Sequence, residues 1–518
     1  MPMHQAQPSS SEFLCRVDVA RKEATTRLIP TERGQKGQFF TPQNVASLMA
    51  SMFEVPPKDI RLLDPGAGIG SLTAAFVEKV LRHRSKPSSI SVTAYEVDGA
   101  LLDELSNTLL LCRNACEEHG VSFSSKVIHA DFIEEAVMCV EPSLFQKAGP
   151  VTATYNCSIM NPPYKKIRSS SDTRKQLRRV QVETSNLYTA FVALALSLME
   201  PDGELVAITP RSFCNGPYFL PFRKILMEKA SFSQIHVFES RKKAFSDDAV
   251  LQENVIYRVV KGRKFKSVIL SSSLGPEDLP TIKKIPYSKV VRPDDKEMFI
   301  RLTLSQQDEH ATLKMASLRS SLKDLDIQVS TGRVVDFRAR EHLRDDPLEN
   351  TVPLIYPCHF SDGYVTWPII EARKPNAIVA REETKKLMVP EGVYVLTKRF
   401  TSKEERRRVV AAIYDPARVT RGDVGFENHL NYFHRNGQGL PPDVAIGLWC
   451  YLNSTLVDQY FRQFSGHTQV NATDLRSLGY PTLNQLKSIA RGIGDQPFKQ
   501  QAFDDVVEMV ISDSQLFH

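Results

Sequence analysis

The sequence has 518 residues, of which 42% are hydrophobic and 24% are charged, an ordinary composition for a folded globular protein. This length exceeds what one hydrophobic core supports, so we expect two domains. No apolar run is long enough for a membrane span, and the first residues lack the apolar core of a signal peptide, which predicts a cytoplasmic protein. The net charge of +6 permits a polyanionic partner without requiring one.

The eight cysteines are scattered along the chain and include no Cys-x-x-Cys pair. Cys112 and Cys116 lie one helical turn apart, but no second pair of ligands accompanies them. This pattern argues against a disulfide framework and against a zinc site. We therefore predict reduced thiols and no bound metal.

Residues 37–262 alternate short β-like segments with helix-like segments. The predicted strands are rich in Val, Ile and Tyr and lie at 60–65, 89–98, 126–132, 155–164, 203–210, 232–240 and 253–261. The helical pattern is seen in Ser71–His83, Ala100–His119 and Leu187–Met199. The alternation predicts a doubly wound, Rossmann-like α/β sheet with its ligand site at the carboxyl ends of the strands. The last two strands follow each other closely, which favours an antiparallel hairpin at one edge of the sheet.

The composition changes along the chain and predicts four parts. Residues 1–36 form an N-terminal arm, 37–262 an α/β catalytic domain, 263–324 a connecting segment rich in Lys, Ser and Pro, and 325–518 a second domain. The second domain mixes loops, aromatic residues and basic clusters, so its fold does not follow from the pattern.

A glycine-rich turn follows the first predicted strand, in the order Asp64, Pro65, Gly66, Ala67, Gly68. Such a turn lets the backbone approach a ligand closely. An acid ahead of the glycines would repel a pyrophosphate but suits a cationic ligand such as S-adenosylmethionine. The alternative is a plain strand-to-helix turn.

Two further acids end the next two predicted strands. Glu96 can accept from both hydroxyls of a ribose, and Asp131, followed by Phe132, can accept from an adenine amino group. Each acid by itself has a simpler interpretation as a solvated strand end. Three consecutive strands that end in acids at one sheet edge favour a nucleoside-containing cofactor.

The sequence Asn161, Pro162, Pro163, Tyr164 follows the fourth predicted strand. The prolines stiffen the loop and remove amide donors, so the Asn161 side-chain oxygen and the Pro162 carbonyl become paired acceptors beside an aromatic ring. Two acceptors that pull on the hydrogens of an exocyclic amine favour the geometry in which its lone pair can attack a sulfonium methyl. The alternative is a proline-stiffened loop without function.

In this order, the segment 37–42, the glycine turn, the two acids and the Asn161–Tyr164 loop resemble the gamma-class amino-methyltransferases of restriction–modification systems, in the PstI-like branch. The resemblance implies methylation of adenine N6 in DNA, with S-adenosylhomocysteine as product. It further implies a C-terminal target-recognition domain of mixed α+β class, and the segments 428–433 and 465–475 resemble segments of such recognition domains.

The resemblance implies roles for individual residues. Thr41 would contact the methionine carboxylate of the cofactor, with Gln38 and Phe40 beside it, while Asp64 and Gly66 would lie along its methionine part. Asn161 and Pro162 would hold the target amine, and Tyr164 would stack on a flipped base. Phe245 is the candidate for the other side of that base, although an ordinary packing role fits it equally well.

Basic residues provide candidate contacts to double-stranded DNA. They are Lys165, Lys166, Arg168, Arg178 and Arg179 after the loop, and Lys398 and Arg399 in the second domain. A solvated charge run is the alternative interpretation. Positive side chains would supply affinity to offset the cost of extruding a base.

Several alternatives stay open. The same loop serves methylation of cytosine N4, of an RNA base or of a protein amide, and an inactive DNA-binding homologue is a further class. A fused nuclease is not expected, because only 36 residues precede Gly37. A separate cognate restriction endonuclease is an expected partner, and the choice between monomer and dimer is open.

Overall fold

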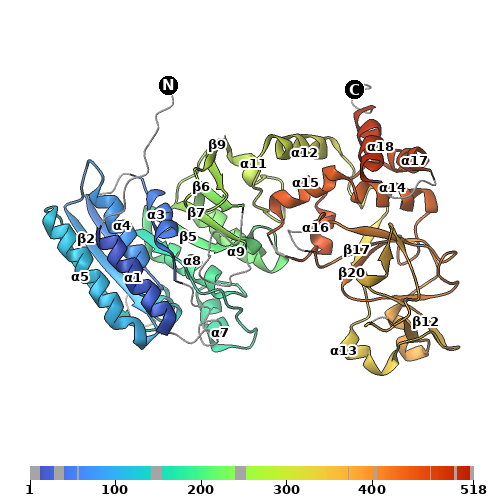
Figure 1. Ribbon diagram of the computed structural model, residues 1–518, viewed down its shortest axis with the longest axis horizontal. Helices are drawn as coiled ribbons and strands as arrows, with labels where there is room; N and C mark the ends of the chain where they lie inside the picture. The colour runs from blue at the N-terminus through green and yellow to red at the C-terminus, as the bar shows by residue number, and fades with distance from the viewer. Residues whose placement is uncertain are drawn as a thin grey trace. The chain divides into compact units, whose positions relative to one another are not determined.

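The computed structural model describes residues 12–27, 40–54, 58–141, 154–239, 253–371, 373–401, 405–466, 468–494 and 499–513. The chain divides into two compact units, Met1–Leu304 and Ser305–His518 (Figure 1). Within the described ranges, no helix combines the length and the apolar character that a bilayer span requires.

The first unit is built on one sheet, in which nine strands are seen in the described residues. In spatial order they are β3 (Ser122–His129), β2 (Ser89–Glu96), β1 (Asp59–Asp64), β4 (Tyr155–Met160), β5 (Met199–Pro210), β7 (Asn254–Lys261), β6 (Ala230–Phe238), β8 (Ser267–Ser273) and β9 (Thr281–Pro286). Strands β7 and β9 run antiparallel to the others.

Helices cover the sheet of the first unit. They are α1 (Glu12–Arg27), α3 (Gln43–Ser51), α4 (Ser71–Leu81), η1 (Gly99–Leu101), α5 (Leu102–Glu118), α6 (Phe132–Val140), α7 (Asp172–Arg179), α8 (Leu187–Leu198), η2 (Arg211–Cys214), η3 (Pro217–Phe219), α9 (Leu220–Lys229) and α11 (Tyr287–Val290).

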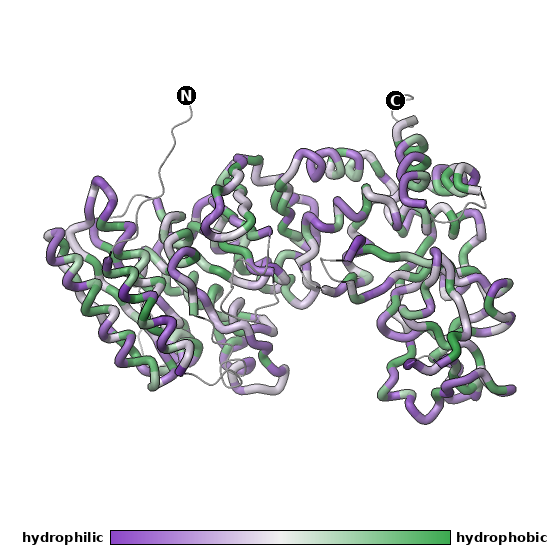
Figure 2. Tube along the Cα trace, in the orientation of Figure 1, coloured by the Kyte–Doolittle hydropathy of each residue, from purple (hydrophilic) through white to green (hydrophobic). Residues whose placement is uncertain are grey.

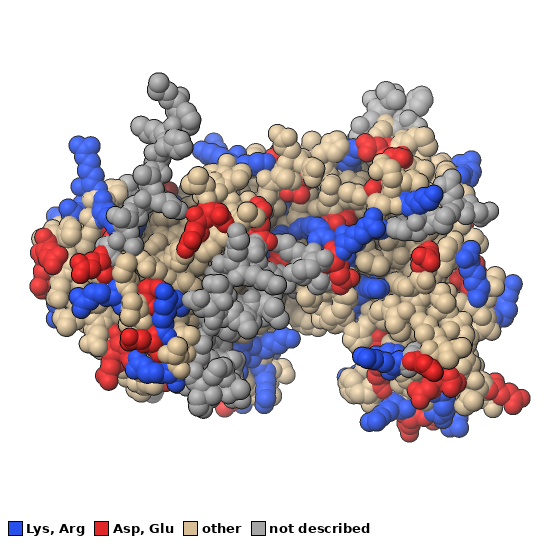
Figure 3. Space-filling view, viewed as in Figure 1, with Lys and Arg blue, Asp and Glu red and all other residues tan. Residues whose placement is uncertain are grey.

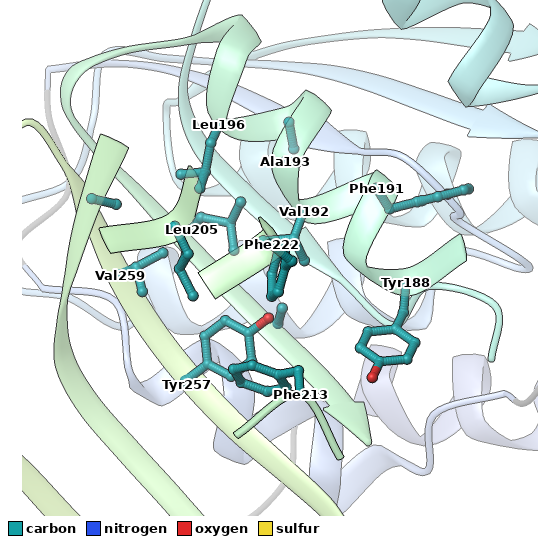
Figure 4. Packing of buried hydrophobic residues seen from close by; sticks show 14 of the residues in the cluster. Tyr188, Phe191, Val192, Ala193, Leu196, Leu205, Phe213, Phe222, Tyr257 and Val259 are labelled. Carbon is teal, nitrogen blue, oxygen red and sulfur yellow. The ribbon is translucent and has the colours of Figure 1, made fainter. Parts of the chain in front are cut away.

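Two hydrophobic layers hold the sheet between these helices. In β1, Leu62 belongs to the layer that contains buried residues of α1, α3, α4 and α5, while Leu63 belongs to the layer that contains buried residues of α6, α7, α8 and α9. This is the alternation that a strand buried on both faces requires. In the layer that contains Leu63, the ring centroid of Phe213 lies 5.4 Å from that of Tyr257 and 5.7 Å from that of Phe222 (Figure 4). Hydrophobic stretches follow the strands and alternate with polar residues along the covering helices (Figure 2).

The predicted Rossmann-like sheet is confirmed, and each of the seven predicted strands and three predicted helices corresponds to an observed element. The position of the predicted hairpin differs. β6 and β7 do pair antiparallel, but β7 lies between β5 and β6, and the sheet continues through β8 and β9. These strands lie in the range expected to be a connecting segment. The edge strand β9 is mostly exposed and carries Lys283 and Lys284, a pattern typical of protected edges that hides the strand signal.

The second unit combines two sheets with a group of helices, as the predicted mixed α+β class requires. One sheet contains β10 (Gln328–Thr331), β20 (Leu430–His434), β17 (Tyr394–Lys398), β18 (Ala411–Tyr414), β14 (Tyr364–Val365) and β13 (Phe360–Ser361). The other contains β11 (Leu343–Arg344), β15 (Ala377–Val379), β12 (Thr351–Ile355), β19 (Val424–Phe426) and β16 (Met388–Val389). The helices are α12 (Gln306–Ser317), α13 (Asp336–Ala339), η4 (Arg340–His342), η5 (Pro357–His359), η6 (Glu382–Leu387), α14 (Pro442–Leu452), α15 (Thr455–Phe464), α16 (Ala472–Arg476), α17 (Leu483–Ile493) and α18 (Gln500–Asp513).

Arg223, on α9, is fully buried and ties three backbone segments of the first unit together. Its guanidinium donates to the carbonyls of Phe213 and Gly216 and to that of Glu297, each at 2.9 Å. Loss of a buried donor leaves its acceptors without a partner in a low-dielectric interior, which costs more than the net value of the bonds.

We predict that Arg223→Met lowers the unfolding free energy of the first unit by about 3 kcal/mol or more. Lys224→Met, on the exposed side of the same helix, is the matched control and should change it by less than about 0.5 kcal/mol. Urea unfolding followed by far-UV circular dichroism measures the difference. Both tryptophans, Trp367 and Trp449, lie in the second unit, so their fluorescence reports on that unit separately. Equal losses in the two variants would contradict the assigned role.

Candidate active site

The carboxyl ends of β1, β2, β3 and β4 meet at one edge of the sheet, because these strands pair in parallel. A cavity of about 280 Å³ opens there. Its lining residues are Phe40, Pro65, Gly66, Gly68, Tyr95, Glu96, Val97, Leu101, Ala130, Asp131, Phe132, Asn161, Pro163, Lys165, Leu187 and Phe191. Residues that the sequence analysis assigned to a cofactor and to a target amine therefore share one cavity.

The glycine turn shapes the floor of this cavity. Gly68 adopts a φ of +56°, which disfavours side chains, and a Cβ atom there would lie 3.3 Å from the ring of Phe40. The Ala67 amide donates to the Tyr95 carbonyl at 2.9 Å and so joins the turn to β2. Because Gly68 has no side chain, Phe40 packs directly against the turn, and the Gly68 backbone lines the cavity.

Glu96, at the end of β2, is 6% exposed and lines the cavity. One carboxylate oxygen accepts from the Gly68 amide and the other from the Asp98 amide, both at 2.8 Å. Burial raises the pKa of the Glu96 carboxyl, while these backbone hydrogen bonds oppose the rise. Each carboxylate oxygen can accept a second hydrogen bond, so the rigidly held group can still receive two donors from a ligand.

Asp131 and Phe132 form the next part of the wall. Asp131 is the N-cap of α6, where one carboxylate oxygen accepts from the Ile133 amide at 2.7 Å, and no donor among the described residues is bonded to its second oxygen. Phe132 is buried, and its ring centroid lies 5.2 Å from that of Tyr95 and 5.1 Å from that of Phe191. An acceptor therefore borders an aromatic surface suited to a flat heterocycle.

Asp64 is placed differently from its expected position along the cofactor. Its side chain is fully buried, it is not among the cavity-lining residues, and one oxygen accepts from the Thr73 hydroxyl at 2.7 Å. Burial raises the pKa of Asp64 to about 7, and the neighbouring Glu96 carboxylate adds to the rise, while the Thr73 hydrogen bond opposes it. The carboxyl holds the start of α4 against β1, beneath the glycine turn.

Asn161 is held at both ends of its side-chain amide. Its Nδ2 donates to Thr41 Oγ1 at 3.1 Å, and its Oδ1 accepts from the Tyr164 hydroxyl at 2.9 Å. Both partners are hydroxyls, which can donate or accept, so the two contacts fix the plane of the amide group. Thr41 is 4% exposed, so its hydroxyl acts inside the site.

The rest of the loop agrees with a rigid acceptor surface. Among the described residues, no hydrogen-bond donor is bonded to the Pro162 carbonyl. The Tyr164 ring is half-buried and meets Tyr188 edge to face at 6.2 Å. Burial raises the pKa of the Tyr164 hydroxyl, which keeps it a neutral donor.

The predicted basic residues fall into two groups. Lys165, Lys166 and Arg168 are exposed, and no carboxylate is paired with them in the described parts of the chain. Arg178 and Arg179, on α7, are ion-paired with Glu183 at 2.9 Å and with Glu141, respectively. In the second unit, the Lys398 ammonium lies 5.8 Å from the centre of the Phe360 ring, and Arg399 donates to the Asn428 carbonyl at 2.6 Å.

Two predicted site residues, Gln38 and Phe245, lie outside the described residues. Other cavity residues were missed, namely Tyr95, Val97, Leu101, Ala130, Leu187 and Phe191. Phe191 belongs to α8, which is apolar all round, so its sequence pattern is that of any buried helix. No signal in the sequence separates an aromatic residue that lines a cavity from one that packs in the core.

Comparison with known proteins adds independent findings. Residues 102–245 match the family model described as Eco57I restriction-modification methylase. The chain is 47% identical to the type II methyltransferase M.PstI from Providencia stuartii, over 95% of this chain and 96% of that protein. It is 44% identical to M.BsuBI from Bacillus subtilis, over 92% and 93% of the two chains. The solved structure of the type IIL restriction-modification enzyme MmeI in complex with DNA has a similar fold, with a TM-score of 0.54 over 96% of this chain and 75% of that one at 12% identity.

The largely parallel sheet, the glycine turn and the loop at the end of β4 define an enzyme with the Rossmann-like methyltransferase fold. More specifically, the chain belongs to the family of type II restriction–modification methyltransferases that includes M.PstI and M.BsuBI. The resemblance inferred from the order of the sequence motifs is thereby confirmed.

The contact between Thr41 and Asn161 leads to a prediction on turnover. Thr41→Val removes one of the two hydroxyls that hold the Asn161 amide, at nearly constant volume, so the amide becomes less rigidly placed and we expect the methyl-transfer rate to fall at least about tenfold. Thr41→Ser keeps the hydroxyl and should stay within about threefold of the wild-type rate. Single-turnover kinetics with saturating cofactor measure the step. Equal rates for the valine and serine variants would contradict this role.

The raised pKa of Asp64 predicts a pH-dependent stability. An unfolded aspartate releases its proton near pH 4, whereas folded Asp64 keeps its proton to about pH 7, so this group makes the fold less stable as the pH rises between these values. Asp64→Asn lacks this loss. Relative to the wild type, its unfolding free energy should therefore increase from pH 4 to pH 8, by at most about 4 kcal/mol. Urea unfolding at several pH values tests this, and parallel pH profiles for the two proteins would refute it.

Proposed function

We propose that this chain transfers a methyl group from S-adenosylmethionine to the N6 atom of a flipped-out adenine at a specific sequence in duplex DNA. It would act as the modification enzyme beside a separate restriction endonuclease. The observation that carries the proposal is that the Asn161 amide and the acids Glu96 and Asp131 border one cavity. An amine-binding group and a nucleoside-binding wall are thus next to each other.

The described residues fit the cofactor. Glu96 offers two fixed acceptors for the hydroxyls of a ribose, and the open oxygen of Asp131 suits the amino group of an adenine. Phe40 and Phe132 supply apolar surface at the same cavity. The backbone of Gly66 and Gly68, without side chains, leaves room for the methionine part. In this proposal Thr41 and Gln38 lie near the methionine carboxylate.

When bound, S-adenosylmethionine supplies a methyl group on a positively charged sulfur. The chain's own residues prepare the acceptor amine. Asn161 Oδ1 and the Pro162 carbonyl accept its two hydrogens, so that its lone pair is withdrawn from the ring and becomes a better nucleophile. Thr41 and Tyr164 hold the Asn161 amide in place beside this amine, and the Tyr164 ring offers a stacking surface. The methylated nitrogen is positively charged and loses one proton to solvent water, because the two neutral oxygens orient the amine but are too weakly basic to take the proton.

Asn161 favours adenine over cytosine as the target base. Related loops that act on cytosine N4 usually begin with serine, whose side chain is shorter and ends in a hydroxyl. A longer amide reaches further from the loop and presents an acceptor that does not itself donate. Phe245 is retained as the candidate for the second face of the base.

Specific residues, rather than overall charge, support duplex DNA as the substrate. On the face shown in Figure 3, basic and acidic side chains are interspersed. Lys165, Lys166 and Arg168 are nevertheless exposed beside the catalytic loop. The exposed ion pairs of Arg178 and Arg179 are worth little in water, so phosphates can replace their carboxylate partners. The relatives M.PstI and M.BsuBI are type II methyltransferases, which supports the same class of substrate.

Expression in a bacterial host without DNA methyltransferases, followed by single-molecule sequencing of its genome, tests the proposal. We expect N6-methyladenine at one short sequence throughout the genome. Asn161→Ala should lower the methylation rate at least about a hundredfold and keep cofactor binding by calorimetry, because only the target amine loses an acceptor. Asn114→Ala, on the exposed side of α5, is the matched control.

Other outcomes discriminate between the alternatives. N4-methylcytosine in place of N6-methyladenine would overturn the choice of base. DNA left unmodified while the purified protein labels RNA or protein would overturn the choice of polymer. Cofactor binding without transfer to any polymer would identify an inactive homologue.

A further inference from the structure

A histidine on the surface of the second unit is anchored by a buried carboxylate. Glu427 follows β19 and is fully buried, whereas the side chain of His429, two residues later, is 47% exposed. One Glu427 oxygen accepts from His429 Nδ1 at 2.5 Å, and the other accepts from the His429 backbone amide at 2.9 Å. Both oxygens of a fully buried acid are therefore directed to one exposed residue.

This pairing fixes how His429 faces the solvent. An ionised carboxylate only accepts hydrogen bonds, so the ring proton lies on Nδ1 and the ring orientation is set. Nε2 is then the ring atom available for an outside partner. The turn itself does not need this contact, because the Leu430 amide already closes it on the Glu427 carbonyl at 3.0 Å. A buried charge is costly, and this one serves to orient an exposed ring.

Three segments that are distant in the chain meet around this ring. The ring of Phe400, 42% exposed, lies 4.9 Å from the His429 ring, and the Arg399 guanidinium lies 5.8 Å from the centre of the Phe400 ring. The Val470 amide donates to the Arg399 carbonyl at 2.7 Å, and Phe400 forms a backbone bridge with Gln469. We call Arg399, Phe400 and His429 the His429 patch. It joins the segments 428–433 and 465–475, which the sequence analysis singled out.

The chemistry of the patch matches duplex DNA. Arg399 contributes a positive charge, Phe400 an apolar ring and His429 one directed polar atom, while the acid beneath is buried. Neutral Nε2 can accept from the exocyclic amine of adenine or cytosine, which are the hydrogen-bond donors of the major groove. A protonated ring can donate to the N7 or O6 atoms of a purine or to a phosphate.

We propose that the His429 patch contacts the DNA substrate and that His429, positioned by Glu427, forms through Nε2 a hydrogen bond that helps to select the recognition sequence. This inference rests on the proposed function. It adds a specificity-determining residue in the second unit and a positioning residue, Glu427, that never touches the DNA.

The test uses the full-length protein and a short duplex that carries the sequence found by methylation mapping, together with duplexes changed at each single base pair. His429→Phe keeps an aromatic ring beside Phe400 and removes the hydrogen bond. We expect its kcat/KM on the mapped sequence to fall roughly tenfold and its discrimination to be lost at one base pair only. His310→Phe, an exposed histidine of α12 in the same unit, is the matched control and should behave as the wild type.

The experiment distinguishes a hydrogen bond to a base from a hydrogen bond to a phosphate. A bond to a base removes discrimination at one position, whereas a bond to a phosphate weakens binding to all duplexes and lowers the salt dependence by about one unit of slope. A phosphate result would keep the DNA contact but overturn the role in sequence selection. Glu427→Gln should reproduce part of the His429→Phe defect at the same base pair.

The remaining outcomes contradict the proposal. A His429→Phe protein with the wild-type discrimination profile, affinity and salt slope would remove His429 from the interface. A Glu427→Gln protein with unaltered tryptophan fluorescence and unaltered discrimination would leave Glu427 as a turn residue only. A wild-type protein that methylates no duplex would instead refute the proposed function, so the two failures are distinguishable.

Discussion

The parallel pairing of β1 with β4 is the constraint on which the site depends. Leu62 and Leu63 lie opposite Cys157 and Ser158, and the Ser158 hydroxyl donates to the Leu63 carbonyl at 3.0 Å. This register brings the glycine turn after β1 and the Asn161 loop after β4 to the same edge. A shift by one residue would exchange the two faces of β4 and turn Ile159 and Met160 toward the wrong hydrophobic layers. Core packing therefore holds the cofactor wall and the amine acceptors together.

With the two loops held at one edge of the sheet, methyl transfer requires few further groups. The acceptor amine requires orientation and polarisation, and neither demands a metal or a covalent intermediate. In the proposed reaction, the Asn161 amide would supply the polarisation through its oxygen. Thr41 lies 120 residues before Asn161 in the chain and Tyr164 lies 3 residues after it, yet both bond to this one side chain. Selectivity for the target sequence is then a separate task, which the second unit can perform with its own residues.

The features that could be predicted from the sequence are those encoded locally. The strands of the first unit, the acids at their ends and the order of the motifs follow from short patterns, and they suffice for the fold class and for most of the cavity. The burial of Asp64 was not predictable, because its partner Thr73 lies on a helix whose rotation depends on packing. Phe191 was missed since a cavity wall and a core helix have the same composition. Strand β9 was not predicted because edge strands carry polar residues, whereas β8, which lies inside the sheet between β6 and β9, was missed because its sequence ends in three serines. The contact between His429 and Phe400 depends on the tertiary structure.

The close approach of Gly68 to Phe40 has a consequence for how mutations in the glycine turn should be interpreted. Phe40 is followed directly by Thr41, and Thr41 carries the acceptor for the Asn161 amide. A methyl group at position 68 would displace the Phe40 ring, and with it the neighbouring Thr41. A substitution at Gly68, a residue expected to affect cofactor binding, would thus also disturb Asn161, through Phe40 and Thr41.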